Sequence, residues 1–255
     1  MNRQAQAAVL FLVGGAMLHA GTTSLYLRYV KAGLQPLLLA SGAVLIVAAL
    51  ATVWYELRRL RAARQHQVGE EPHGHDHEHD DGHGHGHREP RISWLLVLPL
   101  FALILVAPPA LGSYSALRAG TALQPPLAYP ALPSGDPVPL SLVDYAGRAA
   151  YGDGHSLGNR EVEITGFVAL DHGGTPYLVR MALNCCAADA QPVKVGLTGK
   201  LPPVLQPDSW LQVTGTYTDR RTKDPVNGGR IPFLEVREAK PVPTPKDPYD
   251  ESWNQ

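Results

Sequence analysis

The chain is poor in cysteine: Cys185 and Cys186 are its only two in 255 residues, and they are neighbours. A disulfide between adjacent residues closes a strained small ring, so we expect no ordinary disulfide framework. The chain also has little net charge, because 22 Lys and Arg stand against 23 Asp and Glu. A net charge of −1 provides no general attraction to polyanions, and we therefore expect no nucleic-acid partner.

Signatures of common enzyme classes are missing as well. The chain has no G-x-S-x-G nucleophile elbow, no H-E-x-x-H zinc helix and no Gly-rich phosphate-binding loop. Asp144, His155 and His172 could be combined with Cys185 into a catalytic group, but nothing in their spacing requires it. We expect a protein that is not an enzyme.

Charge is also absent from two long apolar runs. Residues 37–55 and 92–112 contain no charged side chain, and their lengths match the ~20 residues that cross a bilayer as a helix. An earlier run, residues 7–27, is more polar. Residues 7–27 could alternatively be a signal peptide that is cut after Ala20. The single Arg3 before the run and the poor cleavage site argue against a signal peptide. The sequence predicts three helices that span a lipid bilayer: residues 7–28, 35–57 and 92–112.

The distribution of basic residues predicts how these helices are oriented. The N-terminus and the linker at residues 58–91 carry seven basic residues, whereas Arg28, Lys31 and Arg118 are the three on the other side. Basic residues are enriched in cytoplasmic loops. We therefore expect a multi-pass protein of the cell membrane with a cytoplasmic N-terminus and linker, and with everything after residue 113 extracytoplasmic.

The linker contains a tract of seven histidines separated only by Gly, Asp and Glu: His73, His75, His77, His79, His83, His85 and His87. Neutral imidazole is a ligand for zinc and other divalent transition metals. The glycines deny the tract a fixed shape, and catalysis needs a fixed set of ligands. The tract therefore predicts a zinc buffer or sensor. The alternatives are an acid-responsive linker and a composition-biased loop without function.

Beyond residue 112 the chain becomes Pro-rich and then alternates between apolar and polar residues. Residues 113–140 predict an extended stalk, and "LSLVDYAGRAA" a short helix. Alternation with period two predicts strands at residues 161–170, 177–183, 192–197, 209–218 and 230–239.

These segments together predict an α+β membrane protein, in which three N-terminal transmembrane helices precede a small extracytoplasmic all-β domain. That domain is an OB-like barrel, with a small β-sandwich as the alternative. The expected divisions are a helical hairpin at 1–57, a His-rich loop at 58–91, the third helix at 92–112, the stalk at 113–140 and the β-domain at 141–255.

The cysteine pair lies inside this β-domain. On a strand the two side chains would point to opposite faces, whereas on a turn both could face one ion. One interpretation is a metal site of Cys185 and Cys186 completed by Asp189 or a nearby histidine. A redox-reactive pair and two buried small hydrophobic residues are the other interpretations, and all three remain open.

A membrane hairpin, a third helix and an outer β-domain with "CCAADA" at residues 185–190 resemble the YcgQ-type bacterial family. The segments "ITGFV" at 164–168 and "PTPKDPYDE" at 243–251 support the resemblance. Members are described as subunits of a two-component membrane permease complex, and some are associated with responses to zinc limitation. The resemblance implies a larger polytopic permease as partner, and it does not establish the transported species. Taken with the histidine tract, it predicts an accessory subunit that takes part in the transport or homeostasis of a metal ion such as zinc. The alternative function is that of a membrane-anchored thiol-redox protein.

Overall fold

The computed structural model describes residues 3–67, 98, 101–102, 110–125 and 128–250. The chain divides into a helical unit and a β unit, and the β unit includes Ser24–Leu34 as well as the chain from Pro109 onward. The histidine tract lies outside the described residues. Of the predicted third helix, residues 98 and 101–102 are helical, residues 110–112 are not, and the rest lies outside the described residues.

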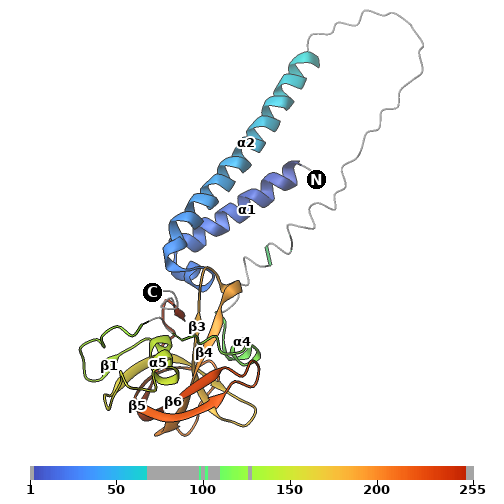
Figure 1. Cartoon of the computed structure of the whole chain (residues 1–255). Coiled ribbons are helices and arrows are strands. Elements are labelled where there is room, and N and C mark those ends of the chain that lie inside the picture. Colours follow the sequence, from blue (N-terminus) through green and yellow to red (C-terminus); the bar gives the residue numbers. More distant parts are fainter. Residues whose placement is uncertain (1–2, 68–97, 99–100, 103–109, 126–127, 251–255) are drawn as a thin grey trace, which may run out of the picture. The chain divides into compact units, whose positions relative to one another are not determined.

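Two antiparallel helices, α1 (Arg3–Thr22) and α2 (Gln35–Gln67), form the helical unit (Figure 1). They cross closely at two glycines, where a Cβ atom added to Gly14 would lie 2.9 Å from the carbonyl oxygen of Gly42. Small residues at a crossing let two helix backbones approach and pack in an apolar environment. An ion pair between Arg3 and Glu56 (2.9 Å) joins the start of α1 to α2.

Both helices are long and apolar enough to cross a membrane. Large hydrophobic side chains are exposed along α2: Leu37, Val44, Val47, Leu50 and Val53.

The first helix ends at Thr22 and not at residue 28, where the prediction placed its end. The hydroxyls of Thr22 and Thr23 both donate to the carbonyl of His19 at the end of α1, and Gln35 Nε2 donates to the carbonyl of Gly21. These bonds satisfy carbonyls that would otherwise have no partner at a helix end.

A closed five-stranded barrel forms the centre of the β unit (Figure 1). β2 pairs antiparallel with both β3 and β5, β3 with β4, and β5 with β6, while β4 and β6 close the barrel in parallel. The strands are β2 (Val162–Leu170), β3 (Pro176–Ala182), β4 (Gln191–Gly199), β5 (Trp210–Lys223) and β6 (Arg230–Val242). The predicted barrel is thus confirmed, and the sheet does not split into a sandwich.

Apolar alternation along the strands explains why they close on a core. Val162, Ile164 and Val213 are buried inside the barrel, as the period of two requires. Gly215 lies at a register shift between β5 and β6, where a Cβ atom would collide with the carbonyl oxygen of Glu235. A glycine is needed there because the two backbones approach closely.

The predicted short helix is α5 (Leu142–Ala150), which packs against all five barrel strands. Ser141 caps its N-terminus by accepting a hydrogen bond from the backbone N–H of Asp144 (3.0 Å). Inside, the hydroxyl of Tyr145 donates to the carbonyl of Phe233 (2.7 Å). The helix thereby fills one end of the barrel core.

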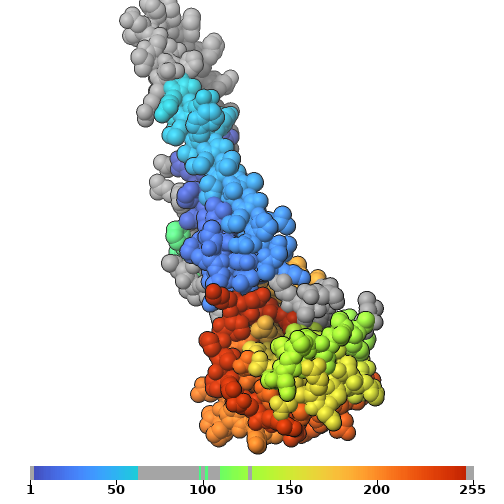
Figure 2. Space-filling model, turned by 90° about the vertical axis from the view of Figure 1, so that its left-hand side faces the viewer, coloured from blue at the N-terminus to red at the C-terminus, as the bar shows by residue number. Residues whose placement is uncertain are grey.

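The segment predicted as a stalk is folded onto the barrel. It begins with the helix α4 (Ser113–Arg118), and later its strand β1 (Val138–Pro139) runs parallel to β2. Between them, the backbone N–H of Ala122 donates to the carbonyl of Pro192 (2.9 Å). Figure 2 shows the yellow-green stretch that ends this segment and continues into α5, in contact with the yellow part of the β unit. Apolar residues within the Pro-rich sequence, such as Leu123 and Val138, are buried, which favours packing over extension.

Candidate functional site

The cysteine pair lies on the connection between β3 and β4. The pairing of these strands ends at Ala182 and Gln191, and a short 3₁₀ helix, η4 (Ala187–Asp189), follows the cysteines. The connection is anchored at its start by Leu183, which is buried and donates its backbone N–H to the carbonyl of Asp250 (3.0 Å). Of the two placements that the sequence allowed, the cysteines occupy the turn.

The carboxylate of Asp189 holds this turn together. Its two oxygens accept hydrogen bonds from the backbone N–H groups of Asn184 (3.1 Å) and Cys185 (2.9 Å). Partial desolvation raises the pKa of Asp189, but hydrogen bonds from the Cys185 thiol and from nearby backbone N–H groups outweigh this and lower the pKa overall. The carboxylate is therefore ionised at neutral pH and shapes the backbone around the thiols.

The thiol of Cys185 is exposed and donates its proton to Asp189. This hydrogen bond, followed by the interaction with Cys186, raises the pKa of Cys185 to about 12. A thiol with so high a pKa is a poor nucleophile near neutral pH, because the thiolate is the reactive form. A cation bound beside the sulfur and the carboxylate would reverse the effect by stabilising both negative charges.

The ligand atoms of Cys185, Cys186 and Asp189 all lie within 4.8 Å of one another. Within the part of the chain that the structure describes, no other group of three or more His, Cys, Asp or Glu side chains has such a spacing. His155 and His172 are exposed elsewhere and do not join this group. Zinc accepts thiolate and carboxylate ligands with four-coordinate geometry, so three donors would leave one position open.

The segment that joins α1 and α2 in sequence docks onto this turn, a contact that sequence reasoning missed. Val30 forms an isolated antiparallel bridge with Cys186. The backbone N–H of Lys31 donates to the carbonyl of Cys185 (3.1 Å), and that of Ala187 donates to the carbonyl of Tyr29 (2.7 Å). These contacts are formed by backbone groups, so the pattern of side chains in the sequence could not predict them. The cysteine turn is consequently held from both sides, by Asp189 and by Tyr29–Lys31.

Comparison with known families identifies the domain type of the β unit. Residues 151–250 match the DUF1980 C-terminal domain, a family of uncharacterised proteins. The matched range contains the five barrel strands and the cysteine turn, and it leaves out the helical unit. No curated protein matches the chain, and no solved structure does. The match therefore identifies the domain, and the accessory role remains a prediction.

Proposed function

We propose that this chain is an accessory membrane subunit of a permease complex, and that its β unit takes part in the transport or homeostasis of a metal ion such as zinc. One observation carries the proposal: the ligand atoms of Cys185, Cys186 and Asp189 lie within 4.8 Å of one another on an accessible turn. Two sulfurs and a carboxylate form a donor set that binds zinc better than it binds magnesium or calcium.

The same geometry favours metal binding over the redox alternative. Redox-active thiols are found where positive charge lowers their pKa, whereas Cys185 lies beside a carboxylate that raises its pKa to about 12. A divalent cation would displace the thiol proton and take over the hydrogen-bonded sulfur. The site is therefore suited to a metal and unsuited to attack on a disulfide.

An incomplete ligand set on a surface turn suits exchange of the metal better than permanent storage. Structural zinc sites are closed by four protein ligands, while sites with an open position accept an outside ligand. The open position at the cysteine turn would be filled by water or by a ligand from the partner permease. Such a site can receive an ion and release it again.

The helical unit and the distribution of basic residues support the proposed placement in a membrane. α1 and α2 are long and apolar enough to cross a membrane. We propose that they do, with the third span in the uncharged run before Pro109, where the β unit begins, and with the β unit outside the cytoplasm. The histidine tract at 73–87 would then act as a separate metal buffer on the cytoplasmic side.

We also assign the barrel to the OB-like class. Its first strand, β2, pairs with the second and the fourth, and its third strand, β4, pairs in parallel with the fifth. This connectivity is that of a five-stranded OB barrel. The assignment concerns the fold alone, because OB-like barrels serve many functions.

Zinc titration of the full chain lacking residues 73–87 tests the metal site without interference from the histidine tract. We expect one zinc ion per chain in competition with a chelating dye, and loss of that ion in the Cys185→Ser/Cys186→Ser variant. Asp171→Asn is a matched control, because the Asp171 carboxylate also caps backbone N–H groups in a β-hairpin turn, those of Gly173 and Thr175. Equal zinc binding by the serine variant would refute the site.

Co-purification tests the accessory role separately. A tagged full chain extracted from its native membrane should bring along a larger polytopic permease. The serine variant should retain that partner while impairing growth under zinc limitation. Recovery of the chain without any polytopic partner would contradict the accessory role and leave the metal site to be judged by titration.

A further inference from the structure

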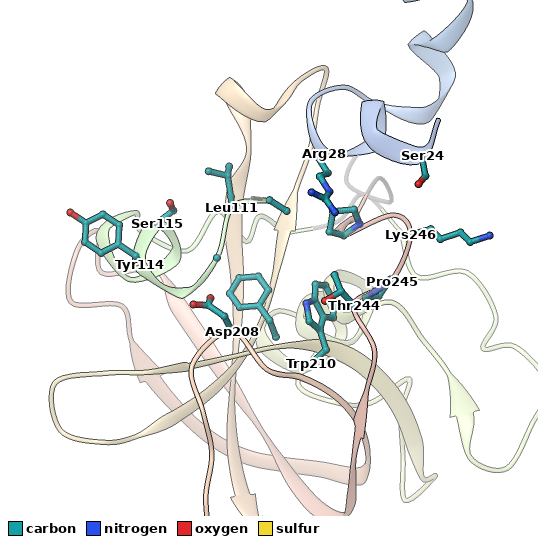
Figure 3. A pocket seen from close by; sticks show the side chains of 14 residues that line it. Ser24, Arg28, Leu111, Tyr114, Ser115, Asp208, Trp210, Thr244, Pro245 and Lys246 are labelled. Carbon is teal, nitrogen blue, oxygen red and sulfur yellow. The ribbon is translucent and has the colours of Figure 1, made fainter. Parts of the chain in front are cut away.

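A pocket lies within the β unit, and its lining includes none of the residues of the candidate metal site (Figure 3). Its volume is about 740 Å³, which is in the range of pockets that bind small molecules. The segment after α1, the chain around α4, the strand β2, the start of β5 and the chain before β7 (Tyr249–Asp250) all contribute to its walls. The charged and large apolar residues of its lining that the argument uses are Arg28, Leu111, Phe167, Asp208, Trp210 and Lys246.

One buried side chain fixes three of these walls relative to one another. The hydroxyl of Tyr249 donates to the carbonyl of Arg28 (3.0 Å) and accepts from the backbone N–H of Leu111 (3.4 Å). Asp208 fixes a fourth wall, because its carboxylate accepts the backbone N–H of Ser113 at the start of α4. The pocket is consequently preformed by the fold.

The lining combines an apolar floor with cations at the rim. Phe167 and Trp210 meet edge to face, with ring centroids 5.8 Å apart. Arg28 and Lys246 are exposed, and neither has an ion pair with any other described residue. In Figure 3 Arg28 reaches over the pocket from the side opposite Trp210. Asp208, the acidic residue of the lining, already binds a backbone N–H group. The pocket therefore suits a ligand with one anionic group and an apolar body.

The chain connectivity indicates where such a ligand would come from. Ser24, which lines the pocket, follows the last residue of α1 by two positions, and Ala110 and Leu111 lie within the uncharged run 92–112. If these segments span the bilayer as proposed above, the pocket is covalently tied to the headgroup layer at two places. Basic residues next to membrane spans are a known means of holding anionic lipid headgroups.

We infer that this pocket binds an anionic phospholipid, with its phosphate at Arg28 and its apolar part against Leu111, Phe167 and Trp210. The side chain of Lys246 points outward from the rim (Figure 3), so it adds positive charge near the entrance and favours the approach of anionic over zwitterionic headgroups. The inference rests on the proposed membrane placement and is independent of the metal site. A bound lipid would keep the segment after α1 seated on the barrel, because Arg28 belongs to that segment.

Native mass spectrometry of the full chain released from nanodiscs tests this inference. The nanodiscs contain equal parts of phosphatidylglycerol and phosphatidylcholine. We expect one retained phosphatidylglycerol per chain, and at least fivefold less retention for Arg28→Gln and for Thr244→Trp, which fills the pocket from its rim. Arg237→Gln should behave like the wild type, because Arg237 is an exposed arginine on β6 that does not line the pocket.

The possible outcomes separate lipid from other ligands. Equal retention of the two lipids, no retained lipid, or full retention by Arg28→Gln would overturn the inference. If millimolar inorganic phosphate displaces the lipid, the pocket is a binding site for free phosphate, and the inference that its ligand is a phospholipid is overturned. A chain that does not enter nanodiscs would refute the membrane placement, and the lipid inference with it.

Discussion

At the scale of single residues, Asp189 controls the thiol beside it. Its hydrogen bond with the Cys185 thiol and its charge disfavour the thiolate, so replacing it by a neutral amide should lower the raised pKa of that thiol towards its ordinary range near ~8.5. In a Cys186→Ser background, Asp189→Asn should therefore speed alkylation of Cys185 at pH 7.5 by about tenfold or more. Mass spectrometry of the iodoacetamide adduct over time measures the rate.

The pH profile of this alkylation gives an independent check. With Asp189 present, the rate should keep rising with pH up to at least pH 10, because the thiol remains largely protonated below its pKa. In the Asp189→Asn variant the rate should level off one to two pH units above ~8.5. Asp171→Asn controls for loss of a turn cap. Superimposable profiles with and without Asp189 would contradict its proposed effect.

A second residue-scale feature is the buried ion pair of Lys194 with Asp224. The Lys194 ammonium donates to Asp224 (2.7 Å) and to the carbonyl of Ala119 (2.9 Å), and both side chains are almost fully buried. Lys194→Met leaves a buried carboxylate without its cation, so the free energy of unfolding should fall by about 3–5 kcal/mol. Chemical denaturation followed by near-ultraviolet circular dichroism measures the change.

The exposed pair of Lys240 with Glu238 provides the comparison. Its side chains are 63% and 59% exposed, and exposed pairs contribute about 0–1 kcal/mol because water screens them. Lys240→Met should accordingly leave the unfolding midpoint nearly unchanged. Similar losses for both methionine variants would show that the buried pair has no special role.

At the scale of elements, the contact between Tyr29–Lys31 and the cysteine turn depends on backbone hydrogen bonds. Lys31→Pro removes the N–H group that donates to Cys185. A lost hydrogen bond of about 1 kcal/mol should make the amides of the turn exchange several-fold faster. Hydrogen–deuterium exchange of a peptide covering residues 184–190 measures this effect.

Lys31→Ala is the matched control, because it removes the same side chain and keeps the N–H group. We expect wild-type exchange in the alanine variant and faster exchange in the proline variant alone. If zinc slows exchange in the cysteine turn, it should also slow exchange in residues 24–34, since the two segments share hydrogen bonds. Faster exchange in both variants would instead attribute the contact to the side chain.

At the scale of the whole molecule, the proposed orientation separates two potential metal sites by a membrane. A reporter that is active only in the cytoplasm should work when it is fused after residue 66 and should be silent when it is fused at Gln255. The basic residues of the linker motivate this expectation. A reporter active only outside the cytoplasm should give the reverse pattern, and an active cytoplasmic reporter at Gln255 would contradict the outer placement of the barrel.

The sequence by itself determined the local elements of this protein. Period-two alternation located the five strands of the barrel, because only one face of each strand is buried. Uncharged apolar runs located α1 and α2, because a helix that crosses lipid needs apolar side chains along its length. Cys185, Cys186 and Asp189 were also recognisable as a candidate site from their types and their spacing.

Only the tertiary structure decided how distant segments meet. It placed the cysteines on a turn, seated Val30 beside Cys186, folded the Pro-rich segment onto the barrel and assembled the pocket around Trp210. The contact of Val30 with Cys186 is made by backbone N–H and carbonyl groups, which almost every residue offers alike, and the other contacts join residues that lie far apart in the sequence. Such contacts leave no periodic signal along the chain, and they appear only when the barrel has closed and brought its connections together.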